Sequence, residues 1–100
     1  MRFYYENFCG DNGYFTLKKT EIVKAIQSAW NIEASLWVMN GKIKEPLFFP
    51  YEDNDVSNEY LKEYNLFIED GSNGYRNLCY LDTGKIAIDY DDYSDVLKLN

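Results

Sequence analysis

The dipeptide Asn40-Gly41 constrains the fold of this chain most, because it stands between two stretches rich in strand-forming residues. A two-residue type I′ turn needs positive φ at both central positions, and Asn followed by Gly adopts such angles at little steric cost. We therefore expect residues 34–39 and 42–48 to form a β-hairpin. A two-residue loop would pair Met39 with Lys42, Val38 with Ile43 and Trp37 with Lys44.

Further strands are expected where aromatic and β-branched residues alternate with clusters of Gly, Asn and Asp. These further strands are residues 2–8, 14–17, 66–69, 75–81 and 85–90. Within the hairpin, Pro46 has no N–H for a strand ladder, so it should end the pairing or mark an edge of the sheet. Residues 96–99 are apolar enough to dock as a last short strand or turn of helix.

Two short helices complete the predicted elements. In the first, Thr20 is the expected N-cap and Glu21 suits the positive end of the helix dipole. Its apolar face is Ile22, Val23, Ile26, Ala29 and Trp30, and its polar side is Lys24, Gln27, Ser28 and Asn31. The second helix covers about residues 52–64, with Val56, Tyr60, Leu61 and Tyr64 on its apolar side.

These elements predict a single small α+β domain over residues 1–100, built from an antiparallel sheet and two short helices. The apolar fraction of 46% in 100 residues suffices for a core without metal or disulfide. Cys9 and Cys79 are expected to be reduced thiols, Cys79 in the core. Residues 2–6 lack the apolar segment of a signal peptide, and no stretch has the length of a membrane span, so we expect a cytoplasmic location.

The charge of the chain is concentrated in its second half. Residues 1–50 hold five acids and six bases, net +1, and residues 51–100 hold twelve acids and four bases, net −8, which gives −7 in total. One group of acids follows the spacing of a helix face, with only Lys62 nearby to offset it, and the other is interleaved with tyrosines. The two groups are Glu52, Asp55, Glu59 and Glu63, and Asp89, Asp91, Asp92 and Asp95.

Most catalytic and cofactor chemistry finds no support in the sequence. The chain has no histidine, so a histidine-based catalyst is excluded, and Cys9 lacks the usual activating partner of a nucleophile. Asp82-Thr83-Gly84 matches the aspartic protease core motif, but a turn between strands explains it. The run from Asp53 to Ser57 begins like a calcium loop but lacks the required Gly and Glu. We expect no catalytic residue, cofactor or metal.

Direct nucleic-acid binding is not expected either. Tyr4, Tyr5, Tyr14 and Phe15 resemble a base-stacking set, but stacking proteins also need a positive groove, and the pI is about 4.4. Acidic faces commonly serve solubility alone. Ten tyrosines in 100 residues, however, cannot all be buried, and tyrosine is enriched in protein interfaces.

The leading hypothesis is therefore a small acidic, non-catalytic inhibitor that occupies a basic nucleic-acid-binding groove of a protein, as antirestriction and anti-CRISPR factors of phages and mobile elements do. Its carboxylates would stand where phosphates bind. The predicted partner-binding residues are the two acidic groups with three tyrosines: Glu52, Asp55, Glu59, Tyr60, Glu63, Asp89, Tyr90, Asp91, Asp92, Tyr93 and Asp95.

Three alternatives stay open at this point. An immunity protein that neutralises a nuclease-type toxin would rest on the same electrostatics. A self-associating structural or scaffold protein would form a homodimer through an apolar edge strand. A small enzyme using acids and tyrosines would show a concave pocket holding carboxylates.

Overall fold

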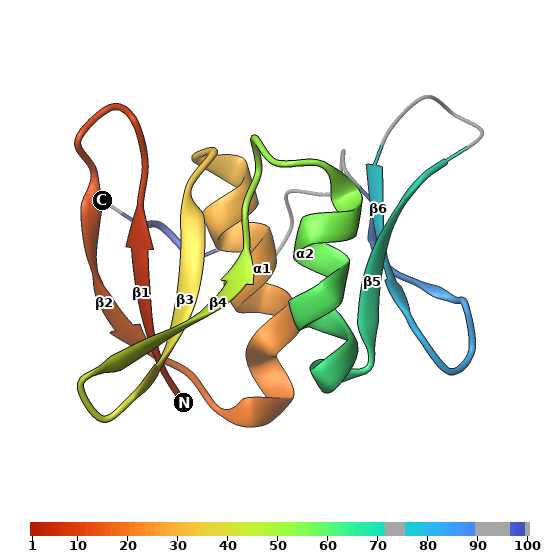
Figure 1. Cartoon of the computed structure of the whole chain (residues 1–100), viewed down its shortest axis with the longest axis horizontal. Coiled ribbons are helices and arrows are strands. Elements are labelled where there is room, and N and C mark those ends of the chain that lie inside the picture. The colour runs from red at the N-terminus through yellow and green to blue at the C-terminus, as the bar shows by residue number, and fades with distance from the viewer. Residues whose placement is uncertain (72–75, 90–96, 100) are drawn as a thin grey trace.

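The strands divide into two antiparallel sheets, as the computed structural model of the chain shows (Figure 1). The structure describes residues 1–71, 76–89 and 97–99. A four-stranded sheet has the order β2-β1-β3-β4, and a three-stranded sheet has the order β5-β6-β7. The strands are β1 (Arg2–Glu6), β2 (Asn12–Thr16), β3 (Ser35–Asn40), β4 (Ile43–Phe48), β5 (Leu66–Asp70), β6 (Arg76–Tyr80) and β7 (Ile86–Asp89). With two short helices, they confirm the predicted α+β class.

The hairpin of β3 and β4 forms where Asn40-Gly41 predicts it, but its register differs by one residue. Asn40 pairs with Ile43, so the turn is centred on Gly41 and Lys42, and the predicted pairing of Met39 with Lys42 is wrong. Of these two central residues, Gly41 alone has positive φ (65°), which is the pattern of a type II′ turn.

Burial of β4 side chains explains this register. A β-bulge opposite Leu36 and Trp37 brings Phe48 across from Leu36, and both Leu47 and Phe48 are fully buried. The predicted register would instead have placed Glu45 opposite Leu36 on the core face. Pro46 lies in β4, an edge strand, as expected.

The first helix, α1 (Ile22–Asn31), follows a short 3₁₀ turn, η1 (Lys19–Glu21). Thr20 lies inside this turn and is not the N-cap, so that prediction is wrong. Instead the Glu21 carboxylate accepts a hydrogen bond from the Lys18 N–H (3.3 Å). The expected apolar face is confirmed, since Ile22, Ile26, Ala29 and Trp30 are buried and Val23 packs against them.

Gln27 and Ser28 of α1 are buried, with 2% and 1% of their surface exposed, although the sequence predicted them on the solvent side. The C-terminal segment accounts for the difference at Ser28. The Ser28 hydroxyl accepts a hydrogen bond from the Leu97 N–H (3.1 Å), and Leu99 is buried in the core. Residues 97–99 therefore dock against α1, but they form neither the short strand nor the turn of helix that the sequence predicted, and residue 96 lies outside the described residues.

The second helix, α2 (Asn54–Leu61), continues into a 3₁₀ turn, η2 (Lys62–Tyr64). The Asp53 side chain caps it by accepting from the Val56 N–H (3.1 Å). Asn65 then ends the element in the left-handed conformation (φ 62°), which Asn tolerates well.

The core lies where the helices meet both sheets. In Figure 1 the helices α1 and α2 lie between the four-stranded sheet and the strands β5 and β6. Helix α1 contacts β3 and β7, and α2 contacts β4 and β5. One hydrophobic cluster accordingly joins Phe3 and Phe48 of the larger sheet to Leu66 and Leu78 of the smaller one. Among the described residues, no helix packs on the other face of the four-stranded sheet.

Candidate functional site

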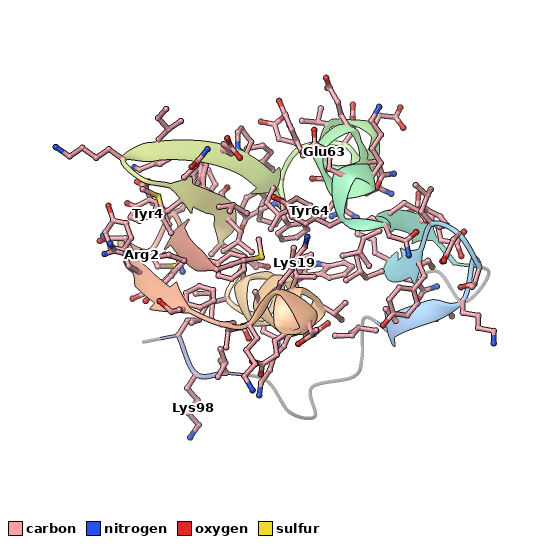
Figure 2. All side chains as sticks on the ribbon, turned by 90° about the horizontal axis from the view of Figure 1, so that it is seen from below. Arg2, Tyr4, Lys19, Glu63, Tyr64 and Lys98 are labelled. Carbon is pink, nitrogen blue, oxygen red and sulfur yellow. The ribbon has the colours of Figure 1, made fainter. Side chains whose placement is uncertain are left out.

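The predicted acids of the second helix form an exposed acidic stripe, defined here as Glu52, Asp55, Glu59 and Glu63. Asp55 and Glu59 lie on α2, Glu63 lies in η2, and Glu52 precedes the helix cap. All four residues are exposed. Within the described part of the chain, none of the four carboxylates forms an ion pair or accepts a hydrogen bond. Figure 2 shows Glu63 and Lys98 on opposite sides of the molecule.

Arg76, the cation that reaches this region from β6, is used by the backbone rather than by the stripe. Its guanidinium donates to the carbonyl oxygens of Pro50 (3.2 Å) and Glu52 (3.4 Å). It thereby holds the loop that precedes α2 and leaves the carboxylates of the stripe unneutralised. No sequence pattern had pointed to this role.

Tyr60, the tyrosine predicted beside the stripe, is half-buried and belongs to a chain of ring contacts. Its ring meets Phe49 edge-on (6.2 Å between centroids), and Phe49 meets Trp37 in the same way (5.7 Å). Trp37 contacts Tyr4 (5.6 Å), and Tyr4 contacts Tyr14 (5.0 Å). This aromatic row therefore links α2 to the helix-free face of the four-stranded sheet.

Two cations lie over the far end of the aromatic row. The Arg2 guanidinium is 4.5 Å from the centroid of Tyr14, and the Lys44 ammonium is 4.0 Å from that of Tyr4. Figure 2 shows Arg2 and Tyr4 together beside this sheet. Of the residues resembling a base-stacking set, Tyr4 and Tyr14 share this face, whereas Tyr5 is buried and contacts Phe15.

The second predicted acidic group lies almost entirely outside the described residues. Asp89 is the last residue of β7, where its backbone pairs with Asn77. Tyr90, Asp91, Asp92, Tyr93 and Asp95 are not among the described residues, so their part in the binding surface stays a prediction.

A small hollow of about 150 Å³ opens at one end of the four-stranded sheet, and sequence reasoning missed it. Loops that are distant in sequence bring its residues together, beyond β1, before β3 and after β4. In Figure 1 these loops lie together at the upper end of the molecule. We call this site the aromatic hollow, and its lining residues are Glu6, Asn7, Phe8, Glu33, Ser35, Trp37 and Tyr51.

Two of the three rings of the aromatic hollow are exposed, and the third, Trp37, is half-buried. Phe8 has 87% of its surface exposed and Tyr51 has 60%, yet their ring centroids are only 5.1 Å apart. The Tyr51 hydroxyl donates a 2.6 Å hydrogen bond to Oε2 of Glu33, and this bond is the main reason why the pKa of Tyr51 is raised. Tyr51 is therefore held as a neutral phenol between the Phe8 ring and the Glu33 carboxylate.

Two local structures fix the loops of the aromatic hollow. The Asn7 amide donates to the Ile32 carbonyl (3.1 Å), and its oxygen accepts from the N–H groups of Cys9 and Asp11. This network ties the β1–β2 loop to the end of α1. Glu33 itself adopts the left-handed conformation (φ 54°) directly after α1.

The cysteines and the rejected motifs behave as the sequence indicates. Cys9 is exposed, Cys79 is buried, and both are free thiols. Burial, together with the Glu69 carboxylate 3.5 Å away, raises the pKa of Cys79 to about 11. Asp82-Thr83-Gly84 forms the turn between β6 and β7, where Gly84 has a φ of 70°. Asp53 caps a helix instead of opening a calcium loop.

No group of three or more acidic or cysteine side chains within residues 1–71, 76–89 and 97–99 is arranged to hold a metal ion. In that same part of the chain, no helix has the length and apolar character needed to cross a membrane. No protein-family model matches the sequence, and neither the curated proteins nor the solved structures compared with it give a significant match.

Proposed function

We propose that this protein is a small non-catalytic binding protein that places the acidic stripe in a basic, nucleic-acid-binding groove of a partner protein. The carrying observation is the arrangement of Asp55, Glu59 and Glu63 along α2 and η2, exposed and without an ion-pairing partner among the described residues. A row of carboxylates of this kind presents negative charge much as phosphates do, which favours fast, salt-sensitive association with a basic groove.

The acidic stripe destabilises its own helix, which supports a role for it in binding rather than in folding. Like charges four residues apart destabilise a helix by about 0.2–0.5 kcal/mol per pair. Glu59 and Glu63 also lie towards the negative end of the helix dipole, where acids are unfavourable. A basic partner would relieve this repulsion on binding.

The aromatic row supports a contact surface that is wider than the stripe. Tyr60 joins the stripe to Phe49 and Trp37, so rings continue from α2 towards the open face of the sheet. Aromatic residues are enriched at interface centres, and charged residues are better tolerated at the rim. We therefore expect the rings to supply contact area and the acids to supply steering and orientation.

The test is a comparison of three immobilised proteins in a lysate of the source organism. The first is the native protein, the second carries D55N, E59Q and E63Q, and the third carries E21Q, E45Q and D82N. The last two lose the same charge, but the third loses it away from the stripe, where Glu45 and Asp82 are exposed and Glu21 is half-buried. We expect the native and third proteins to retain the same basic protein, and high salt to release it.

The captured protein must then be shown to bind nucleic acid in competition with this chain. The native protein should displace a labelled oligonucleotide from it, and the stripe variant should fail to do so. Equal capture by all three proteins, or capture without competition against the oligonucleotide, would overturn the proposal.

A further inference from the structure

The aromatic hollow unites three rings and two carboxylates in a space the size of one side chain. The rings belong to Phe8, Trp37 and Tyr51, and the carboxylates to Glu6 and Glu33. We propose that the hollow binds the side chain of one arginine on the partner protein. The inference deepens the proposed function and rests on it for the basic character of the partner.

The exposed rings suit a cation in particular. The guanidinium of arginine stacks on aromatic faces, and it sheds its hydration more readily than an ammonium does. Phe8 contributes little to the core because most of its ring is exposed, but Tyr51 holds it in place at a centroid distance of 5.1 Å. The pair therefore offers a ready apolar surface that the fold itself does not cover.

The carboxylates supply the complementary charge. The lining of the hollow includes two acids and no lysine or arginine, while outside the lining the Lys44 ammonium lies 5.9 Å from the Trp37 centroid and the Tyr4 hydroxyl donates to the Glu6 carboxylate (3.3 Å). Glu33 uses Oε2 to accept from Tyr51, and its Oε1 accepts no hydrogen bond from a described residue. A guanidinium presents several N–H donors in one plane, so it can stack on a ring and also donate to a carboxylate at its edge.

The backbone at Glu33 gives independent support. The N–H groups of Glu33 and Ala34 donate to the carbonyls of Trp30 (3.0 Å) and Ala29 (2.8 Å), which is the Schellman pattern at the end of α1. The left-handed position of this motif usually belongs to glycine, yet here it carries a glutamate at φ 54°. Strained backbone of this kind concentrates at functional sites, and in this case it puts a carboxylate at the hollow.

The size of the hollow limits the ligand. Its volume of about 150 Å³ lies below the roughly 300–1,000 Å³ of pockets that take drug-sized molecules. One extended side chain matches this volume better than a cofactor or a nucleotide does. Lysine would gain the charge interaction, but its compact ammonium cannot stack and donate in one plane as a guanidinium can.

The test is an NMR titration of the folded chain with the tripeptide acetyl-Gly-Arg-Gly-amide. The same peptide with citrulline keeps the shape and removes the charge, and a lysine version keeps only the charge. We expect saturable shifts at Phe8, Glu33, Trp37 and Tyr51 with the arginine peptide, weaker binding of the lysine peptide and none of the citrulline peptide.

Two variants locate the binding in the hollow. E33Q keeps an acceptor for Tyr51 and should weaken arginine binding about fivefold or more through the lost charge. F8A removes an exposed ring and should weaken arginine binding roughly two- to fivefold, which is the size of an exposed cation–π contact. D82N removes one charge from the β6–β7 turn and should leave the affinity unchanged.

Absence of saturable shifts at the hollow, equal binding of the citrulline peptide, tighter binding of lysine, or equal weakening by E33Q and D82N would each overturn the inference. These readouts need no partner and do not involve the acidic stripe. Failure of the stripe variants in the lysate experiment therefore overturns only the proposed function, and failure of the titration overturns only the arginine site.

Discussion

Glu33 shows how a single residue can work against the stability of its own fold. A non-glycine residue in the left-handed region costs about 1–2 kcal/mol. Glu33 meets this cost at the end of α1, where its φ is 54°, while its carboxylate holds Tyr51. Backbone strain at this position is consistent with the proposed role of Glu33 in the arginine site.

Replacement of Glu33 by glycine is expected to stabilise the protein by about 0.5–1 kcal/mol, since the relief of strain exceeds the added entropy of the unfolded chain. Urea unfolding of E33G against the native protein measures this change. E33Q, which keeps the strain, should match the native protein. A less stable E33G would show that the carboxylate contributes more to folding than the backbone strain removes.

Cys79 provides a pH-dependent contribution to stability. Its pKa is about 11 in the folded protein against a usual 9.0, so folding favours the protonated thiol. The sign follows directly: this contribution is fully present below pH 9 and is lost as the pH rises from 9 through 11. The unfolding free energy of the native protein should therefore fall more steeply over this range than that of C79A.

Thiol labelling gives a second measurement on the same residue. A thiol reagent should modify the exposed Cys9 at once and Cys79 only after denaturant is added, because Cys79 is buried and protonated. Rapid modification of both thiols in the folded protein would contradict the burial of Cys79.

At the scale of elements, Asn58 joins α2 to the edge of the smaller sheet. Its amide donates to the Ile68 carbonyl (2.9 Å) and accepts from the Ile68 N–H (2.6 Å). Asn58 thus does for β5 what a neighbouring strand would do. These two hydrogen bonds explain why α2 has a polar residue, Asn58, at the position where it packs against β5.

Substitution of Asn58 by leucine is expected to cost about 2–4 kcal/mol, because it leaves two partly buried backbone groups without partners. Chemical denaturation measures the total loss, and hydrogen exchange at the Ile68 amide should rise locally. N58D keeps the acceptor but loses the donor, so its loss should fall between those of the native protein and N58L. No change in exchange at Ile68 would contradict the proposed clamp.

The register of the β3–β4 hairpin shows the limit of local signals at this scale. Asn40-Gly41 locates the hairpin because Gly41 adopts a positive φ, but the turn is centred one residue later than predicted, on Gly41 and Lys42. The register depends instead on burial of Leu47 and Phe48 against the rest of the core, which residues outside the hairpin provide. A bulge satisfies that burial, and no local pattern distinguishes it from a regular ladder.

At the scale of the whole molecule, the two sheets share one hydrophobic core, although no described strand of one sheet pairs with a strand of the other. Each helix contacts a strand from both sheets, and Leu78 of β6 belongs to the same cluster as Phe3 and Phe48. We therefore expect the chain to unfold as one cooperative unit.

Replacement of the fully buried Leu78 by alanine tests this cooperativity. The loss should be about 2–5 kcal/mol, as for other buried leucines. Both tryptophans, Trp30 and Trp37, report on the other half of the fold, in α1 and β3. Their fluorescence and the far-UV circular dichroism should shift to the same lower midpoint. Fluorescence that keeps its native midpoint would show that the two halves unfold separately.

The candidate surfaces differ in how much of them a sequence can reveal. The acidic stripe is visible because its members repeat at helical spacing within twelve residues, so local structure alone places them together. The aromatic hollow cannot be recognised in the sequence, since Phe8, Glu33 and Tyr51 come from three separate loops. Only the arrangement of β1, α1 and β4 around the core brings these loops to one end of the molecule.

The sequence by itself determined the approximate positions of the elements, the α+β class and the exposure of the acidic stripe. These follow from local preferences of the backbone and from apolar spacing. The tertiary structure alone decided the division into two sheets, the hairpin register, the burial of Gln27 and Ser28, and the aromatic hollow. Each of these depends on contacts between residues far apart in the chain, and such contacts are fixed by packing, which leaves no periodic signal in the sequence.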